Sequence, residues 1–288
     1  MTVVMGIVNV TPDSFSDGGR FFAQDAAIAH GLALRAAGAD LLDIGGESTR
    51  PGAERVAPSV EQERVLPVIR ALAAEGAAVS IDTMNAATAA AAVAAGATIV
   101  NDVSGGLADP GMLTAVAGTG AEFVVGHWRG PSSDMYARAE YGDVIREVVT
   151  ELSGRLEAAA VAGIAPSRVI LDPGIGFGKR GDQNWSVLRG LPRILGIGPR
   201  VLVGTSRKRF LAETLLPTVL GAQRGTQPPT LDDVSEERRD LATAVTSALA
   251  AREGVWGVRV HDVGATRDAL RIAQAWEGDR RWTATPSR

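Results

Sequence analysis

The stretch Arg168-Val169-Ile170-Leu171-Asp172 is a short apolar run enclosed by a basic and an acidic residue. Its apolar residues are consecutive, so they do not alternate with polar residues as in a strand with one face in water. The runs Ile99-Val100 and Phe123-Val124-Val125 have the same character. Strands covered on both faces are typical of parallel sheets, whose connections are usually helices. The sequence therefore predicts parallel strands packed against helices.

Short apolar runs bounded by Gly, Pro or Asp recur along the chain and predict eight strands. These are residues 3–9, 40–44, 77–82, 98–102, 121–127, 168–172, 200–204 and 255–261. Segments with helical periodicity lie between them, among them 25–37, 59–75, 85–95, 142–162 and 236–252. The mean spacing of about 36 residues is enough for a strand, a helix and two loops. We therefore predict an α/β fold, a single-domain (β/α)8 TIM barrel.

A doubly wound open sheet is the alternative, but the first strand leads into Val10-Thr11-Pro12-Asp13 instead of a G-x-G-x-x-G phosphate loop. One domain over residues 1–278 is expected, with a flexible tail at 279–288. The long connections 9–20 and 47–57 are predicted to be active-site loops, and 218–233 a flexible insertion.

The composition excludes several function classes. The 288 residues are 45% hydrophobic and 22% charged, as in an ordinary globular protein, and the net charge of −4 provides no basic field for nucleic acid. No apolar run is long enough to span a membrane, and the first residues do not resemble a signal peptide. The absence of cysteine excludes disulfides, thiolate metal ligands and a cysteine nucleophile. We expect a cytoplasmic protein without nucleic-acid or membrane partners.

Nearly every predicted strand ends at polar side chains. In chain order these are Asn9, Asp43, Asp82, Asn101 and Asp102, His127, Asp172, Ser206 and Lys208, and Arg259 and His261. In a (β/α)8 barrel the carboxyl ends of all strands meet at the face that carries the active site. We therefore expect these residues to meet in one cleft.

The types of side chain in this cleft limit the substrate. Carboxylates and amides can pair with the edge of a heterocycle, and cations can bind a phosphorylated or carboxylated group. The cations are Lys208, Arg259, Arg50 and His261. Asn9, Asp13 and His127 do not make a closed zinc site. One amide oxygen together with phosphate oxygens suits Mg²⁺, so we expect Mg²⁺ bound with a diphosphate.

Two long motifs resemble the signatures of the dihydropteroate synthase family. They are Met5-Gly6-Ile7-Val8-Asn9-Val10-Thr11-Pro12-Asp13-Ser14-Phe15-Ser16-Asp17-Gly18-Gly19 and Asp43-Ile44-Gly45-Gly46-Glu47-Ser48-Thr49-Arg50-Pro51-Gly52. Shorter matches follow in family order: Ser80-Ile81-Asp82-Thr83, Asn101-Asp102-Val103, Asp172-Pro173-Gly174-Ile175-Gly176-Phe177-Gly178-Lys179, Ser206-Arg207-Lys208 and Arg259-Val260-His261-Asp262-Val263. The resemblance covers roughly residues 3–275.

The resemblance implies a (β/α)8 barrel that joins 6-hydroxymethyl-7,8-dihydropterin diphosphate to p-aminobenzoate. The products are 7,8-dihydropteroate and diphosphate, in folate biosynthesis. It implies a transferase with a carbocation-like transition state and no covalent enzyme intermediate. It also implies a Mg²⁺ cofactor, competition by sulfonamides and a homodimer.

The resemblance further assigns roles to individual residues. Asp172 pairs with the amino and ring N–H groups of the pterin, assisted by Asn101 and Asp82. Asp17 and Asp82 stabilise the cationic centre, and Asn9 binds Mg²⁺. The implied catalytic residues are Asp17, Asp82 and Lys208, and the implied substrate-binding residues are Asp82, Asn101, Asp172, Phe177, Lys208, Thr49, Arg50, Ser206, Arg259 and His261.

Within this set Lys208 contacts the oxo edge of the pterin, and Arg259 and His261 bind the diphosphate. Ser206, with either Arg50 or Arg207, lies near the carboxylate of p-aminobenzoate or the diphosphate.

Structural roles compete with functional ones at several positions. Asp43 and Asp102 are either helix caps or site residues, and His127 is interpreted as a buried structural histidine. Lys179 follows a glycine-rich stretch that lacks the Walker spacing, and it is interpreted as a solvated lysine.

One position departs from the family pattern. The residue before His127 is commonly a Met that packs by the pterin ring, and here it is Gly126. Either Trp128 fills the space or pterin binding is weaker.

Two other functions compete with the synthase. A barrel that holds a methylated folate for a methyltransferase, or a noncatalytic relative, also needs Asp82, Asn101 and Asp172. Only the synthase needs the diphosphate and p-aminobenzoate motifs, which are intact at 13–19, 48–52, 206–208 and 259–261. A sugar-phosphate barrel enzyme is disfavoured because carboxylates predominate over phosphate-loop glycines. The synthase is therefore the predicted function.

Overall fold

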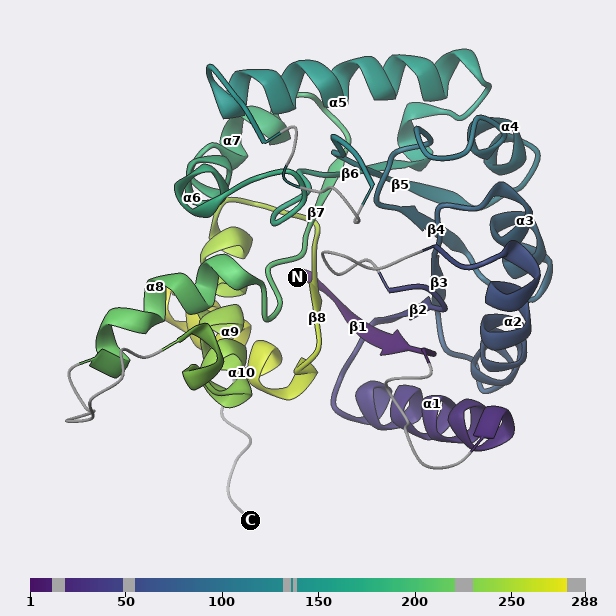
Figure 1. Ribbon diagram of the computed structural model, residues 1–288, viewed down its shortest axis with the longest axis horizontal. Coiled ribbons are helices and arrows are strands. Elements are labelled where there is room, and N and C mark those ends of the chain that lie inside the picture. The colour runs from purple at the N-terminus through teal and green to yellow at the C-terminus, as the bar shows by residue number, and fades with distance from the viewer. Residues whose placement is uncertain (12–18, 49–54, 132–135, 137–138, 221–229, 279–288) are drawn as a thin grey trace.

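The computed structural model describes residues 1–11, 19–48, 55–131, 136, 139–220 and 230–278. Eight parallel strands form a closed barrel in chain order, and the last strand pairs with the first. They are β1 (Val3–Asn9), β2 (Leu41–Gly45), β3 (Val79–Asp82), β4 (Ile99–Asp102), β5 (Glu122–Gly126), β6 (Val169–Asp172), β7 (Arg200–Val203) and β8 (Gly257–Val260). Helices surround this ring of strands (Figure 1).

Among the described residues, the α-helices are α1 (Gly19–Ala36), α2 (Pro58–Ala74), α3 (Ala86–Ala94), α4 (Met112–Ala117), α5 (Val144–Val161), α6 (Gly181–Arg189), α7 (Leu191–Leu195), α8 (Arg209–Leu220), α9 (Glu236–Arg252) and α10 (Val263–Trp276). Short 3-10 helices are η3 (Pro166–Arg168) and η4 (Leu231–Asp233). Each predicted strand begins and ends within two residues of the observed one. The single-domain (β/α)8 barrel is confirmed, and the doubly wound sheet is excluded by closure.

The prediction of a flexible insertion at 218–233 was wrong at both of its ends. Helix α8 continues to Leu220, and η4 occupies Leu231–Asp233. The turn of η4 is closed locally, because Asp233 Oδ2 accepts the backbone N–H of Thr230 at 2.6 Å and its hydroxyl at 3.1 Å. Residues 221–229, like the predicted tail at 279–288, lie outside the described residues. The domain limit at residue 278 stays a prediction.

The barrel interior begins with an apolar layer. Alternate residues of a strand point to opposite faces, so each strand sends one set of side chains inward and the other toward the helices. The inward set packs as one cluster of Met5, Leu41, Ile99, Val124, Ile170 and Leu202, with Val3 and Trp256 against it. Burying one such side chain stabilises the fold by about 1.5–3 kcal/mol. The outward set, including Val4 and Val8, packs in the larger cluster with the helices.

Two residues further along several strands, the inward side chains become polar. Asp43 follows Leu41, and Asn101 follows Ile99. On β6, Asp172 follows Ile170 in the same way. Because i and i+2 share a face, these side chains form a polar layer directly above the apolar one, toward the carboxyl ends of the strands. The apolar layer therefore supports a polar site at one end of the barrel.

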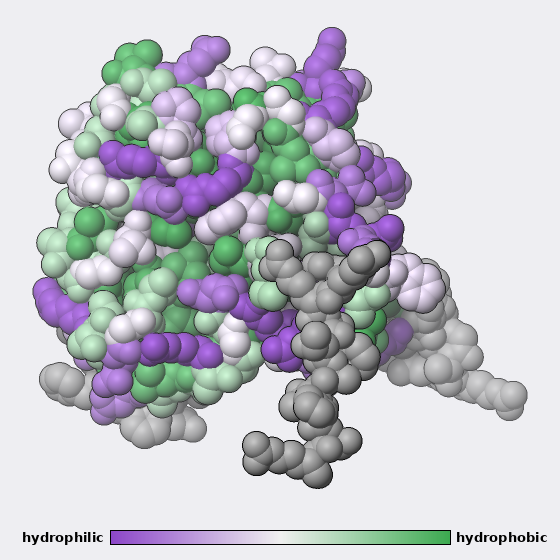
Figure 2. All heavy atoms as spheres, turned by 180° about the vertical axis from the view of Figure 1, so that it is seen from behind, coloured by the Kyte–Doolittle hydropathy of each residue, from purple (hydrophilic) through white to green (hydrophobic). Residues whose placement is uncertain are grey.

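One face of the outer surface has no such segregation. On the side opposite to the view of Figure 1, hydrophobic and hydrophilic residues are intermixed (Figure 2). Within the described residues, the helices are all too short or too polar to cross a lipid bilayer.

Candidate active site

The polar strand ends open onto a cavity of about 1140 Å³. This volume slightly exceeds the roughly 300–1,000 Å³ of a typical small-molecule site, so two small substrates can be accommodated together. The predicted site residues that line it are Asn9, Asp82, Asn101, Asp172, Phe177, Ser206, Lys208, Arg259 and His261. Asp17, Thr49 and Arg50 lie outside the described residues. The fold thus brings together every predicted site residue that the structure describes.

Parts of the two predicted active-site loops also reach this cavity. Thr11, which follows β1, and Glu47 and Ser48, which follow β2, contribute to its lining. Burial raises the pKa of Glu47, although an ion pair with Arg55 at 3.3 Å opposes the rise. The rest of each loop that falls in 12–18 and 49–54 is outside the described residues.

Arg259 connects carboxylates of two different strands. Its Nε donates to Asp43 Oδ2 at 2.6 Å, and its Nη2 donates to Asp82 Oδ2 at 2.7 Å. The amide of Asn101 donates to the same Asp43 oxygen at 3.0 Å. The four residues come from β2, β3, β4 and β8, so the network crosslinks the polar layer across the barrel.

Two carboxylates share one guanidinium in this network. Burial raises the pKa of Asp82; the Arg259 charge opposes the rise, and the neighbouring Asp43 carboxylate adds to it. Burial by itself lowers the pKa of Arg259, but the two carboxylates outweigh it and hold the pKa above the usual arginine value. The guanidinium is therefore permanently charged. Because two carboxylates share this one positive charge, the site can also bind a ligand that brings N–H donors or positive charge.

Asp43 is a member of this network and not a helix cap. Its side chain is fully buried, and its Oδ1 finds no hydrogen-bond partner among the described residues. Asp102 is not a helix cap either, because the N-cap of α4 is Gly111; the side chain of Asp102 closes the turn after β4. Its Oδ1 accepts the backbone N–H and the hydroxyl of Ser104 at 2.8 and 2.7 Å, and its Oδ2 accepts the N–H of Gly106 at 2.7 Å.

Asp172 and Lys208 influence each other inside the cavity. Burial raises the pKa of Asp172, and the charge of Lys208 opposes the rise. Burial lowers the pKa of Lys208 to about 8, and Asp172 opposes that shift. The Lys208 ammonium donates to the carbonyl of Ile175 and lies 4.7 Å from the centre of the Phe177 ring. Asp172 Oδ1 accepts the backbone N–H of Gly174 at 2.7 Å.

Ser206 fixes the imidazole of His261. The hydroxyl oxygen accepts the backbone N–H of His261 at 3.0 Å and lies 2.8 Å from Nδ1 of its ring. The hydroxyl can donate its hydrogen to Nδ1 or accept one from it, so this contact orients the ring in either tautomer. Arg259 and His261 are two positions apart and both line the cavity, as their spacing predicts.

The guanidinium of Arg207 is engaged by helix α9. It binds Asp240 through two hydrogen bonds, both of 2.8 Å, and Glu236 through one of 2.7 Å. Of the two arginines predicted beside a substrate anion, Arg207 thus has its charge compensated, and Arg50 lies outside the described residues.

A family model for pterin binding enzymes matches residues 5–261, a span that contains both long motifs and all predicted site residues. The chain belongs to the pterin-binding enzyme family. Dihydropteroate synthase from Mycobacterium leprae is 49% identical to it over 274 residues, which are 95% of this chain and 93% of that protein.

Solved structures agree with membership of the pterin-binding enzyme family. The dihydropteroate synthase of Xanthomonas albilineans with 4-aminobenzoic acid has a TM-score of 0.84 at 43% identity, covering 98% of this chain and 94% of that chain. The Yersinia pestis dihydropteroate synthase, in a sulfonamide drug complex, has a TM-score of 0.85 at 36% identity, covering 96% and 94%.

Gly126, the departure from the family pattern, has a structural cause. A Cβ atom at Gly126 would lie 2.3 Å from the carbonyl oxygen of Val103, so the backbone after β4 occupies this space. Val103 lines the main cavity. Gly126 and Trp128 both line a second cavity of about 220 Å³ together with residues of α5, and the position that a Cβ of Gly126 would take is occupied by the Val103 backbone. Whether pterin binding is weaker stays a prediction.

Asn9 lines the cavity, and the described residues contain no group of three His, Cys, Asp or Glu side chains that could hold a metal ion. The amide oxygen of Asn9 and Oδ2 of Asp82 lie 3.8 and 3.7 Å from where Gly45 would carry a Cβ atom. Within the described part of the chain, no hydrogen bond engages the Asn9 amide. Oxygen donors of this kind fit a hard cation that keeps waters and substrate oxygens as its other ligands.

The interpretation of Lys179 as a solvated lysine was wrong. Only about 1% of Lys179 is exposed, and it lines the cavity. The sequence contained a signal that Lys179 is not an ordinary surface residue. The chain has two lysines, Lys179 and Lys208, whereas its other basic residues, apart from the histidines, are arginines. His127 is buried and hydrogen-bonded, as expected of a structural histidine.

Proposed function

We propose that this member of the pterin-binding enzyme family is a dihydropteroate synthase in folate biosynthesis. It joins 6-hydroxymethyl-7,8-dihydropterin diphosphate to p-aminobenzoate and releases diphosphate. The observation that carries the proposal is the single cavity in which Asp82, Asn101 and Asp172 meet the cationic end of β8. The identity of 49% to the Mycobacterium leprae synthase, over nearly the whole chain, supports it.

The carboxylate of Asp172 recognises the donor edge of the pterin. That edge offers an amino group and a ring N–H side by side, which match the two oxygens of a carboxylate. Lys208 donates to the neighbouring oxo group, and its pKa of about 8 keeps it mostly protonated at neutral pH. A heterocycle without these donors leaves a buried carboxylate unpaired, so the site discriminates against it.

The reaction breaks the bond between the exocyclic methylene carbon and the diphosphate oxygen. Both electrons leave with the diphosphate, so positive charge develops on the methylene and the conjugated pterin. Carboxylates near this carbon stabilise the charge, and we assign that role to Asp82 and to Asp17. The amine nitrogen of p-aminobenzoate then forms the new C–N bond and releases a proton. No covalent bond to the protein is formed.

The departing diphosphate is stabilised at the end of β8. Arg259 stays charged because of its carboxylate partners, and Ser206 holds the ring of His261 in place beside it. We propose Mg²⁺ as the cofactor, held by Asn9 together with substrate oxygens. When bound, Mg²⁺ neutralises the charge of the diphosphate leaving group.

We assign the p-aminobenzoate site to Ser206, Thr49 and Arg50. Its carboxylate needs a cation or a hydroxyl donor, and the loop arginine and the two hydroxyl groups supply them. The solved structure of the Yersinia pestis relative is a complex with a sulfonamide drug. We propose that sulfonamides compete with p-aminobenzoate here as well.

We also propose that the protein works as a homodimer. Leu241, Val245 and Leu249 lie four residues apart on α9, and each is at least 50% exposed. On the neighbouring helix α10, Ile272 and Trp276 are more exposed still. Contiguous exposed apolar side chains are typical of protein–protein interfaces. A cytoplasmic location, expected from the sequence, remains part of the proposal.

The experiment that tests the function is a condensation assay. The purified protein, Mg²⁺, dihydropterin diphosphate and p-aminobenzoate are mixed, and dihydropteroate and diphosphate are quantified together. We expect equal amounts of both products, and their formation should require Mg²⁺. Tight pterin binding without product would instead favour a noncatalytic pterin-binding barrel.

A further inference from the structure

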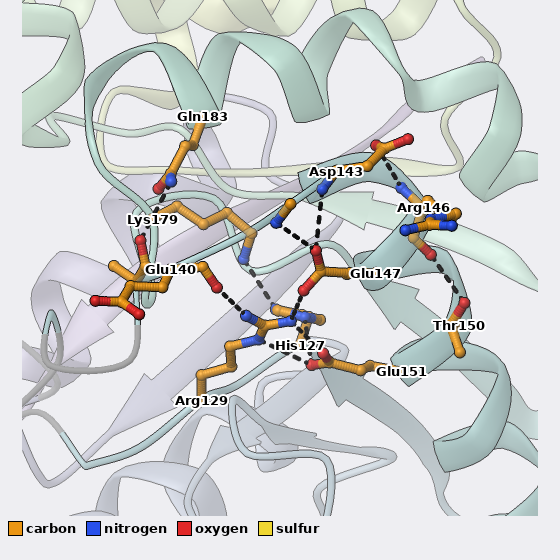
Figure 3. Close-up of polar contacts among 12 residues, drawn as sticks. His127, Arg129, Glu140, Asp143, Arg146, Glu147, Thr150, Glu151, Lys179 and Gln183 are labelled. Atoms are coloured by element: carbon orange, nitrogen blue, oxygen red, sulfur yellow. Dashed lines mark hydrogen bonds and ion pairs between the residues drawn. The ribbon is translucent and has the colours of Figure 1, made fainter.

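Lys179 has no role in the proposed reaction, yet it is a buried cation at the cavity wall. Its ammonium donates to the carbonyl oxygens of Gly174 at 2.9 Å and Phe177 at 3.0 Å, and it lies 2.9 Å from Nδ1 of His127. The close-up in Figure 3 shows the lysine pointing at this histidine. When Lys179 is protonated, its three hydrogens have three protein acceptors, which leaves none for a substrate.

His127 can accept a hydrogen bond from Lys179 in only one tautomer. An ammonium only donates, so Nδ1, 2.9 Å from it, must be the acceptor, while Nε2 on the other side of the ring lies in an ion-pair contact 2.9 Å from Oε2 of Glu151. The ring hydrogen therefore belongs on Nε2, and the lone pair of Nδ1 faces the ammonium. Burial and the charge of Lys179 lower the pKa of His127 to about 4, so the ring is neutral at physiological pH.

Glu151 is held ionised by its partners on the outer side. Partial burial opposes ionisation, but hydrogen bonds from His127 and Arg129 lower the pKa of Glu151 to about 2. Arg129 also binds Glu147, one turn earlier on α5, at 2.6 Å (Figure 3). A continuous series of polar contacts therefore runs from α5, through the end of β5, to the glycine-rich loop after β6.

The turn that Lys179 holds carries two elements of the pterin site. Gly174 donates its N–H to Asp172, and its carbonyl accepts the N–H of Phe177 at 3.0 Å. The Phe177 ring lies next to Lys208. Gly174 has a φ of +64°, and a Cβ there would lie 2.1 Å from the carbonyl oxygen of His127. The turn is thus packed directly against the end of β5.

We propose that Lys179 is a positioning residue for pterin binding. It ties the turn from Gly174 to Phe177 to His127, and through this turn it orients the Asp172 carboxylate and the Phe177 ring toward the pterin. The inference rests on the proposed function, because it takes the pterin as the ligand of the cavity.

The use of basic residues in the chain supports this role. Lysine occurs only at positions 179 and 208, although the chain contains 29 basic residues of the Lys and Arg types. An ammonium directs three donors tetrahedrally, whereas a guanidinium is larger and planar and cannot satisfy the same three acceptors in the same space.

The test compares the wild type with Lys179→Met, which removes the donors and retains an unbranched side chain. Binding of 6-hydroxymethylpterin is measured by calorimetry without p-aminobenzoate, and KM is measured for both substrates. We expect pterin affinity to fall at least about tenfold, whereas KM for p-aminobenzoate changes less than about twofold. Lys179→Arg should not restore the affinity.

A second, milder pair of variants tests the same series of polar contacts at its α5 end. Glu151→Ala and Glu147→Ala each remove a carboxylate of α5 that binds Arg129, but only Glu151 contacts His127. We expect Glu151→Ala to weaken pterin binding several-fold and Glu147→Ala to leave it within about twofold.

Unchanged pterin affinity in Lys179→Met, equal losses in the two glutamate variants, or equal losses for both substrates would each overturn the positioning role. The proposed function fails separately, if the wild type binds the pterin but forms no dihydropteroate. Because the pterin is bound in the absence of p-aminobenzoate, the two failures are distinguishable.

Discussion

Asp43, Asp82 and Asp172 lie close together at the carboxyl end of the barrel, and Arg259 and Lys208 are the cations that act on them most strongly. An arrangement with surplus carboxylates stabilises a developing cation more than a neutral substrate, which is what a dissociative reaction requires. The same surplus explains why Asp82 has a raised pKa even though it is bonded to Arg259. The chemistry of the site is therefore determined by individual side chains and by their hydrogen-bond and ion-pair partners.

The pKa of Lys179 leads to a prediction about stability and pH. Burial lowers this pKa from 10.5 to about 7, so between these values the unfolded chain binds a proton that the folded protein has released. The free energy of unfolding should therefore rise with pH in this window, by up to about 1.4 kcal/mol per pH unit from this group. We expect the wild type to gain stability relative to Lys179→Met between pH 7 and 9, as measured by urea denaturation.

Parallel stability curves for the two proteins would contradict this assignment. A direct control is available, because a chain with two lysines gives two side-chain signals in an NMR spectrum of lysine-labelled protein. Both signals should titrate below the ordinary lysine range, and the signal that disappears in Lys179→Met should titrate first.

At the scale of elements, the close approach of the β4 turn to the end of β5 depends on Gly126. A methyl group there would overlap the carbonyl of Val103, which is backbone and cannot rotate away. We expect Gly126→Ala to reduce the free energy of unfolding by about 1–3 kcal/mol, as overpacking does, and to weaken pterin binding by displacing Val103. Chemical denaturation and calorimetry measure the two effects.

Gly154, in the middle of α5, is the matched control. A Cβ at this position meets nothing within 4 Å, so Gly154→Ala should stabilise the protein by about 0.5–1 kcal/mol through helix propensity alone. If Gly126→Ala were equally harmless, the tight contact with Val103 would not exist in solution.

The elements themselves were largely predictable from the sequence, and so was the site, because strand ends could be recognised from runs such as Val169–Asp172. What the sequence did not reveal was burial. An aspartate such as Asp43 could equally be a helix cap, and a lysine such as Lys179 could equally lie on the surface. Only the packing of distant segments distinguishes these roles. The space beside Gly126 was likewise unpredictable, since it is filled by the backbone of the turn after β4. The extension of α8 to Leu220 was missed because residues 218–233 as a whole are rich in Pro, Thr, Gln and Gly, a composition typical of loops.

For the whole molecule, the layered barrel interior explains why the site lies at one end. The apolar layer excludes water from below, and the polar layer above it carries the charges in a partly buried setting where they act strongly. The proposed dimer adds a second use of the outer surface, through the exposed apolar side chains of α9 and α10, whereas the first turn of α9 lines the cavity.

The dimer prediction concerns the apolar stripe on α9. Val245→Glu introduces a charge into this stripe, so we expect a dimeric wild type and a monomeric variant by light scattering coupled to gel filtration. Val161→Glu is the control, because Val161 is equally apolar and even more exposed but lies at the end of α5. A monomeric wild type, or equal effects of both substitutions, would contradict the proposed interface.

The most direct test of the account is pterin binding by Asp172→Asn. The side-chain oxygen of this variant can still accept the N–H of Gly174, but its amide cannot pair with two donors of a pterin. We therefore predict a loss of affinity on the order of 100-fold with little change in thermal stability. Asp102→Asn should show the reverse, with affinity retained and stability reduced by about 1–3 kcal/mol, because its carboxylate holds only a turn. Wild-type pterin affinity in Asp172→Asn would contradict the central claim that this carboxylate recognises the substrate.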